Sequence, residues 1–180
     1  VTTDPLIVDW FLRPHLAAWC SFAEVTLMVN MAAPHADFVL DPRVQLEHVA
    51  IQRRIAPFRD LLTLYRLICA FRRGRYSGVY SVAPKAGLLA MLAAWIARVP
   101  FRCHVFQGEV WKTRRGPIRW LLRSADRVTA AAATEILVVS DSERRFLVRE
   151  GVINASKALV LGKGSISGVD PTRFRPDPVA

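Results

Sequence analysis

Short apolar runs alternate along the chain with longer segments in which apolar residues recur every three or four positions. The short runs are typical of buried strands, and the longer segments have the period of helices. The predicted strands are Thr26–Asn30, Glu47–Ile51, Gly78–Val82, Phe101–Phe106, Glu135–Ser140 and Ala158–Leu161. The predicted helices lie near Trp10–Phe22, Pro57–Arg73, Lys85–Arg98, Pro117–Ala132 and Asp141–Glu150. This alternation predicts a Rossmann-like α/β fold, a parallel sheet with helices on both faces.

Local signals refine some of these elements. Val1–Thr3 has the character of the end of a buried strand, and Pro14 would break a helix that ran through it. Pro57 suits the first turn of its helix, and Pro117 suits the start of another. The apolar stripe of the first of these helices consists of Phe58, Leu61, Leu62, Tyr65, Ile68 and Cys69. In the second we expect an inward face made of Ile118, Leu121, Leu122 and Ala125.

The chain has 180 residues, of which 52% are hydrophobic, so it is long enough for one globular domain with a sizeable core. The longest apolar stretch without charge, Ala86–Ala97, is too short to span a bilayer. Three cysteines with no ligand spacing are typical of reduced thiols in a cytoplasmic protein. The sequence also lacks a glycine-rich nucleotide loop, a Cys/His metal cluster and a Ser-His-Asp arrangement, so we expect no metal or other cofactor.

The net charge of +10 is concentrated in two arginine-rich segments. Arg53–Arg75 holds seven arginines against Asp60, and Lys112–Arg127 holds six basic residues against Asp126. Such an excess attracts polyanions, although an ordinary solvated surface explains it as well. In the second segment Arg115, Arg119, Arg123 and Arg127 share one helix face beside Trp120. This pattern suits a membrane surface with anionic lipids, and an ordinary surface helix is the alternative.

Ligands of parallel α/β sheets bind beyond the carboxyl ends of the strands. The segments expected at this edge are polar and flexible, and suit a sugar or phosphate-bearing ligand: Thr3 and Asp4, Ala83–Lys85, Gln107–Trp111, Ser140 and Lys163–Ser167. Lys85 stands at a helix start, where its ammonium and free amides could meet an anion, or where it is simply solvated. Glu109 is the best-placed carboxylate, and His104 lies inside a predicted strand. Both are weak candidates for catalysis, and the catalytic residue is unknown.

Six segments in order resemble the N-terminal domain of family 4 glycosyltransferases, which have the two-Rossmann-domain GT-B fold. They are Val1–Leu16, Arg54–Leu67, Ala83–Pro100, Val105–Arg123, Ile136–Val148 and the terminal GSISGVDPTRFRPD. The subgroup that the chain resembles builds cell-surface polysaccharides. Two positions depart from the family pattern: Gln107 and Tyr80 stand where many relatives carry histidine, which leaves the acceptor open.

The resemblance implies a hexosyltransferase that moves a sugar, with retention and without a metal, from a nucleotide-sugar to a saccharide or to a glycan on a polyprenyl diphosphate. It assigns residues 1–163 to the acceptor-side domain and 164–180 to a hinge leading to a donor-binding domain beyond Ala180, so we expect no activity from these residues alone. The acceptor rim would be Asp4, Lys85, Gln107, Gly108 and Glu109, and the cleft loop Ser165 and Gly168.

The location implied by the resemblance is the cytoplasm, with peripheral attachment at the inner face of the cell membrane. Two alternatives stay open. One is a non-catalytic basic module that binds membranes or nucleic acid, although no nucleic-acid motif is present and we expect no nucleic-acid partner. The other is a nucleotide-sugar epimerase of the same architecture.

Overall fold

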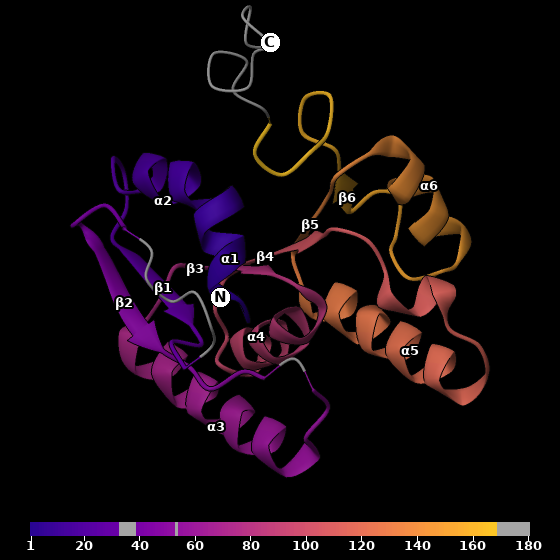
Figure 1. The fold of residues 1–180 in the computed structure, drawn as a ribbon, viewed down its shortest axis with the longest axis horizontal. Coiled ribbons are helices and arrows are strands. Elements are labelled where there is room, and N and C mark those ends of the chain that lie inside the picture. Colours follow the sequence, from indigo (N-terminus) through magenta and orange to yellow (C-terminus); the bar gives the residue numbers. More distant parts are fainter. Residues whose placement is uncertain (33–38, 53, 169–180) are drawn as a thin grey trace, which may run out of the picture.

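Parallel strands form the centre of the fold, as the sequence predicts (Figure 1). The structure is a computed structural model and describes residues 1–32, 39–52 and 54–168. The strands are β1 (Val25–Val29), β2 (Val44–His48), β3 (Gly78–Val82), β4 (Phe101–Phe106), β5 (Glu135–Val138) and β6 (Ala158–Leu159). Strand β1 pairs with β2, and the other four pair in the order β3-β4-β5-β6.

The first residues of the chain join these two groups of strands. Thr2 forms a parallel bridge to Val29 of β1. On the other side, the Val82 N–H of β3 donates to the Val1 carbonyl at 3.1 Å. Val1–Thr3 therefore lies between β1 and β3, and the order across the layer becomes β2-β1-(1–3)-β3-β4-β5-β6. The expectation that this segment belongs to a buried strand is confirmed, since Thr2 is fully buried.

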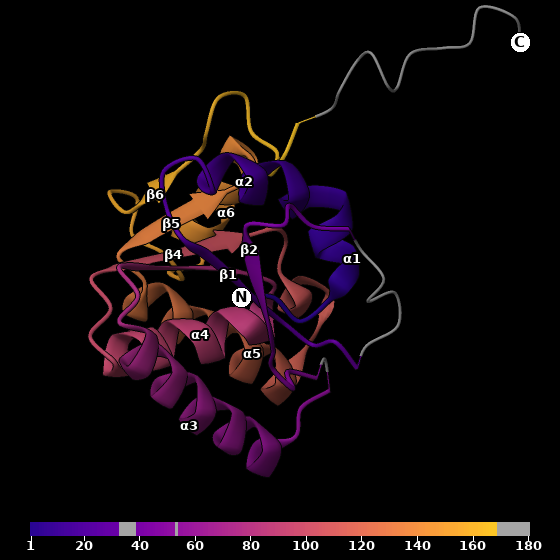
Figure 2. The same cartoon turned by 90° about the vertical axis from the view of Figure 1, so that its left-hand side faces the viewer.

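Helices cover both faces of this layer, as predicted (Figure 2). On one face lie α3 (Pro57–Gly74), α4 (Pro84–Ile96) and α5 (Gly116–Ala132), and on the other lie α2 (Arg13–Trp19) and α6 (Asp141–Arg149). Two shorter elements are α1 (Pro5–Ile7) and the 3₁₀ turn η2 (Val110–Thr113). Helix α4 packs between α3 and α5, which explains why it is apolar all round. Most of its residues are buried against the sheet and its two neighbours.

The first helical segment differs from the single predicted helix. It begins at Pro5 and contains a π-helical stretch, η1 (Val8–Leu12), before α2. There the Arg13 N–H donates to the Val8 carbonyl, five residues earlier. Pro14 follows in the first turn of α2, a position where its missing N–H costs nothing. The wide turn thus lets the chain stay helical on both sides of the proline.

Strand β2 lies three residues before its predicted position, Glu47–Ile51. The prediction followed the apolar residues Val49 and Ile51, which are buried but lie beyond the end of the strand. The paired residues Gln45–His48 are exposed, as befits the edge strand of the layer. Hydrophobicity therefore located the buried anchor of this segment, not its hydrogen-bonded part.

The predicted apolar stripe of α3 faces the core only in part: Phe58, Leu61, Leu62 and Tyr65 are exposed, whereas Ile68 and Cys69 are half-buried and Ile68 packs against the core. The buried residues of the helix are Thr63, Leu67 and Phe71, whereas Phe58 is 90% exposed and Tyr65 is 64% exposed. The inward face expected for α5 is wrong in part as well. Leu122 and Ala125 are half-buried, but Ile118 is 41% exposed, because the buried side of α5 consists of Asp126, Thr129, Ala130 and Ala132.

Candidate functional site

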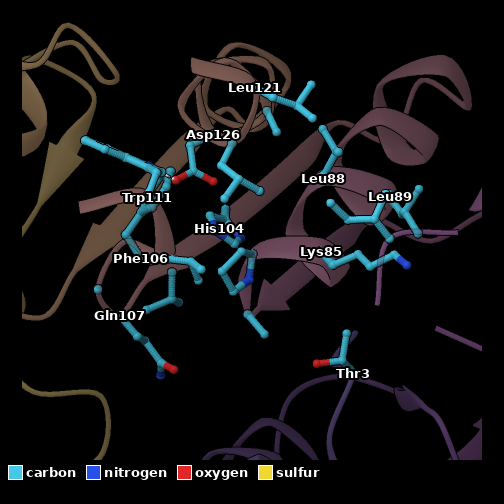
Figure 3. Close-up of a pocket in the computed structure, with 18 of the residues that line it drawn as sticks. Thr3, Lys85, Leu88, Leu89, His104, Phe106, Gln107, Trp111, Leu121 and Asp126 are labelled. Carbon is cyan, nitrogen blue, oxygen red and sulfur yellow. Dashed lines mark hydrogen bonds between the residues drawn. The ribbon is translucent and has the colours of Figure 1, made fainter. Parts of the chain in front are cut away.

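A cavity of about 630 Å³ opens at the carboxyl ends of β3 and β4, between the start of α4 and the middle of α5 (Figure 3). Its polar residues include Thr3, Lys85, Gln107 and Asp126. Most of the remaining wall is apolar and comes from four different elements: Leu88, Leu89, Phe106, Val110, Trp111, Leu121 and Leu122. The predicted carboxyl edge of the sheet thus contains a cavity, and the lining of this cavity is more apolar than the sequence suggested.

Three of the five residues predicted for the acceptor rim line this cavity: Lys85, Gln107 and Gly108. Gly108 has φ +104°, a conformation that side chains rarely adopt, and an added Cβ would meet open space. The glycine is therefore required by the backbone, which turns sharply after β4. This turn leaves the side chain of Gln107 exposed at the mouth of the cavity.

Lys85 is held by other protein groups. Its Nζ lies 2.6 Å from the Asp60 carboxylate of α3 and also donates to the Arg54 carbonyl. In Figure 3 its amine points away from Gln107. The ammonium is therefore already compensated, and the expected free cation at the start of α4 is an ion pair on the cavity wall.

Asp4 and Glu109 do not line the cavity. The Asp4 carboxylate caps α1 by accepting the Leu6 N–H at 3.0 Å. Glu109 faces Glu143 of α6, and burial together with that carboxylate raises the pKa of Glu109 to about 7. One oxygen of Glu109, Oε1, is buried with no hydrogen-bond partner among the described residues. Neither carboxylate is therefore part of the cavity wall.

His104 lines the cavity but is a buried, structural-looking histidine. Its Nδ1 lies 2.8 Å from the Ser81 Oγ of the neighbouring strand, and its ring packs directly on Gly87 of α4. Burial lowers the pKa of His104 to about 3, so the ring is neutral near pH 7. At that pH the ring therefore contributes no charge to the cavity wall.

A buried pair that was not predicted from the sequence, Trp111 and Asp126, also lies at the cavity. The Trp111 Nε1 donates to the Asp126 Oδ2 at 2.7 Å, and both side chains are almost fully buried beside the cavity. Burial raises the pKa of Asp126 to about 6, against the opposing effect of the indole hydrogen bond. One signal was available: Asp126 is the lone acid within a strongly basic helix, on its buried side.

Two of the three arginines proposed for a membrane face, Arg119 and Arg123, have a partner directly after the end of α6. Arg119 lies 2.9 Å from the Glu150 carboxylate, and Arg123 donates to the carbonyl of the same residue. Arg127 donates to the Gly151 carbonyl at 2.8 Å. These contacts join α5 to the carboxyl end of α6, where cations are favoured by the helix dipole. Arg115 and Trp120 are exposed to solvent, and membrane binding by this face stays a prediction.

The predicted cleft loop follows β6 and returns to the carboxyl end of β5. The Ser165 N–H donates to the Val139 carbonyl at 2.8 Å, and Ile166 contacts the His15 Nε2 of α2 through its carbonyl at 2.7 Å. Gly164 and Gly168 both have positive φ angles. Ser165 is thus placed at the predicted edge of the sheet, and residues 169–180 of the predicted hinge lie outside the described residues.

Comparison with known families identifies the chain. The family model described as "Glycosyl transferase 4-like domain" matches residues 14–164. The chain belongs to this family. Its parallel sheets and helices on both faces agree with the glycosyl transferase 4-like assignment, and so does the placement of the cavity at the carboxyl edge.

Two curated relatives of this glycosyl transferase 4-like domain are sugar transferases by name. One is the capsular polysaccharide biosynthesis glycosyltransferase CapM of Staphylococcus aureus, 31% identical over 74% of this chain and 35% of that protein. The other is the UDP-Gal:alpha-D-GlcNAc-diphosphoundecaprenol alpha-1,3-galactosyltransferase of Escherichia coli, 23% identical over 85% of this chain and 39% of that protein. The chain therefore spans less than half the length of these relatives.

Solved structures with a similar fold include a complex with UDP-glucose and an epimerase. Anabaena Alr3699/HepE in complex with UDP-glucose has a TM-score of 0.63 at 14% identity, covering 99% of this chain and 46% of that one. The UDP-GlcNAc 2-epimerase of Methanocaldococcus jannaschii has a TM-score of 0.63 at 15% identity, covering 90% and 44%. At these identities the likeness establishes the GT-B-type Rossmann-like fold. None of the helices in the described part of the chain is long and apolar enough to cross a membrane.

Proposed function

We propose that this domain binds the acceptor in a glycosyltransferase that moves a hexose from a nucleotide-sugar to a glycan carried on a polyprenyl diphosphate. The observation that carries the proposal is the cavity at the carboxyl ends of β3 and β4, which combines a polar mouth with an apolar interior. The family membership supplies the reaction class. Transfer would proceed with retention and without a metal, and the donor would bind mainly to a second domain.

The lining of the cavity favours a lipid-linked acceptor over a free sugar. A sugar is recognised through many hydrogen bonds to its hydroxyls, whereas Leu88, Leu89, Leu121 and Leu122 offer none. Apolar walls of this extent contribute favourably to binding only when apolar ligand surface covers them and removes them from water. The first isoprene groups of a polyprenyl carrier have the required chemistry. The Escherichia coli relative, whose name includes a diphosphoundecaprenol acceptor, supports this interpretation.

The polar groups at the mouth would then hold the head of the acceptor. Thr3 and Gln107 can donate and accept hydrogen bonds to hydroxyl or phosphate oxygens. The backbone at Gly108 leaves space for close approach, because nothing lies within 4 Å of its missing side chain. Lys85 would contact the acceptor only if its ion pair with Asp60 loosened. Asp4 and Glu109 would not contact the acceptor in this arrangement, because neither lines the cavity.

A binding experiment with a soluble acceptor analogue tests this proposal. The probe is N-acetylglucosamine diphosphate carrying a farnesyl chain, and the reference ligand is N-acetylglucosamine 1-phosphate, both measured by isothermal titration calorimetry. Covering the apolar wall with two or more isoprene groups is expected to strengthen binding at least about tenfold over the reference. The Leu121→Asn variant should bind the farnesyl compound more weakly and bind the reference ligand with unchanged affinity.

The matched control is Val128→Asn, which changes an exposed apolar residue on the same helix outside the cavity lining. It is expected to bind both ligands as the unmodified chain does. Equal affinity of the two ligands, or an equal effect of Leu121→Asn on both, would refute the lipid-linked acceptor. Salt-dependent binding of unrelated DNA without binding of either ligand would favour the basic-module alternative.

A further inference from the structure

Helix α3 presents an apolar face to solvent, here called the α3 outer face and defined by Phe58, Leu61, Leu62 and Tyr65. These side chains are 90%, 66%, 49% and 64% exposed, respectively. They recur at three- and four-residue spacing, so they lie together over about two helical turns. The opposite side of the helix packs on α4. Figures 1 and 2 show α3 at the outside of the molecule, with α4 between it and the sheet.

Helix α3 departs from the usual arrangement of a surface helix, because it is apolar on its outer side as well as on its buried side, which includes Leu67 and Phe71. An amphipathic helix normally buries its apolar stripe and exposes its polar side. Here the buried side includes Thr63, whose Oγ1 donates to the Arg59 carbonyl at 2.8 Å, while an exposed phenylalanine and tyrosine lie outside. A contiguous exposed patch of large apolar side chains marks a surface that another apolar phase covers.

Charge indicates which phase covers the α3 outer face. Arg59, Arg66 and Arg73 recur every seven residues, so they form one edge beside the apolar patch, and all three are exposed. Arg72 adds a fourth exposed cation, whereas the single acid of the helix, Asp60, is turned toward Lys85. An apolar face rimmed by arginines complements a layer of anionic headgroups above acyl chains. A protein partner would require no such uniform sign.

The α3 outer face also lies near the candidate cavity. Ile55, which is 62% exposed and precedes α3 by two residues, lines that cavity. The salt bridge from Asp60 to Lys85 joins the first turn of α3 to the cavity wall. Apolar surface is therefore found on both sides of this junction, on the outside of α3 and inside the cavity.

We propose that α3 lies in the plane of an anionic membrane, with the α3 outer face in the boundary between headgroups and acyl chains. The flanking arginines contact the headgroups. This assigns membrane binding to α3 in place of α5, whose Arg119 and Arg123 are held by Glu150. The inference does not rest on the proposed acceptor, because it concerns the bilayer surface itself and its test contains no acceptor.

Vesicle co-sedimentation tests the proposal. The 180-residue chain is mixed with vesicles of phosphatidylcholine alone or with phosphatidylglycerol, and the bound fraction is measured against lipid concentration. We expect binding to the anionic vesicles that Phe58→Ser with Leu61→Ser lowers at least about tenfold. Arg59→Glu with Arg66→Glu should lower it at least about twentyfold, since each cation near such a surface contributes about fivefold. These residues are exposed, so the thermal midpoint should not change.

The matched control changes the same kinds of residue on α5: Trp120→Ser with Arg115→Glu. It is expected to leave vesicle binding unchanged, and a loss of binding confined to this variant would overturn the assignment to α3. Absence of binding to anionic vesicles would overturn the proposal as well. Light scattering after size exclusion tests whether the α3 outer face instead binds a second copy of the chain. A dimer that the α3 variants dissociate, together with no vesicle binding, would identify a second copy as the partner.

Discussion

Gly87 near the start of α4 provides a test of the packing around the candidate site in which two effects have opposite signs. Helix propensity alone favours alanine over glycine by about 1 kcal/mol in a helix. Packing opposes it, because an alanine Cβ at this position would lie 2.2 Å from the His104 Cε1 and 2.6 Å from its Nδ1. The sign of the measured change therefore shows which effect dominates.

The cost of the contact follows from the surroundings of His104. The ring is 1% exposed and, although it borders the candidate cavity, it can make room only by leaving its packed position, so inserting a methyl group here costs about 1–3 kcal/mol. Moving the ring also breaks its 2.8 Å hydrogen bond to Ser81, and a buried group left unsatisfied costs about 1–3 kcal/mol. After the gain in helix propensity, we expect Gly87→Ala to lower the free energy of unfolding by about 3 kcal/mol.

Urea unfolding of four variants measures this contribution: the unmodified chain, Gly87→Ala, His104→Ala and the double variant. Without the imidazole the clash is gone, so adding Gly87→Ala to His104→Ala should be neutral or stabilise by up to about 1 kcal/mol. The change of sign between the two backgrounds is the expected result. The same loss in both backgrounds, or a gain in both, would refute the proposed contact between α4 and His104.

The order of elements and the edge that carries the site could be predicted from the sequence. Continuous apolar runs identify strands buried on both faces, and their alternation with helices leaves a parallel sheet as the layer that buries them all. That topology brings Lys85, Gln107 and Gly108 to one edge, because the carboxyl ends of parallel strands lie together. The cavity lining contains all three.

What could not be predicted depends on neighbours from distant parts of the chain. The period of α3 shows that the helix has an apolar side, but the surface that this side meets is set by α4 and by whatever lies outside. Likewise, the charge of Lys85 is visible in the sequence, whereas its partner Asp60 is brought near by the packing of α3 on α4. Trp111 and Asp126 form their hydrogen bond because η2 folds back on α5.

Two further predictions concern catalysis and pH. We expect these 180 residues to transfer no sugar from any nucleotide-sugar in a radiolabel assay, because they span less than half of their curated relatives, and turnover would refute a separate donor-binding domain. The second concerns Asp126, whose pKa burial raises from 3.8 to about 6. Between these values the native state keeps a proton that the unfolded chain has released, so the stabilisation present below about pH 4 is lost as the pH rises through 6. About two pH units at ~1.4 kcal/mol each amount to ~3 kcal/mol. Asp126→Asn keeps an acceptor for the Trp111 indole without the charge. The advantage of the unmodified chain over this variant should therefore fall by ~3 kcal/mol between pH 4 and pH 7, as measured by urea unfolding. The exposed Asp9→Asn serves as the control, and a pH-independent difference at Asp126 would show that its carboxylate is not held in a buried site.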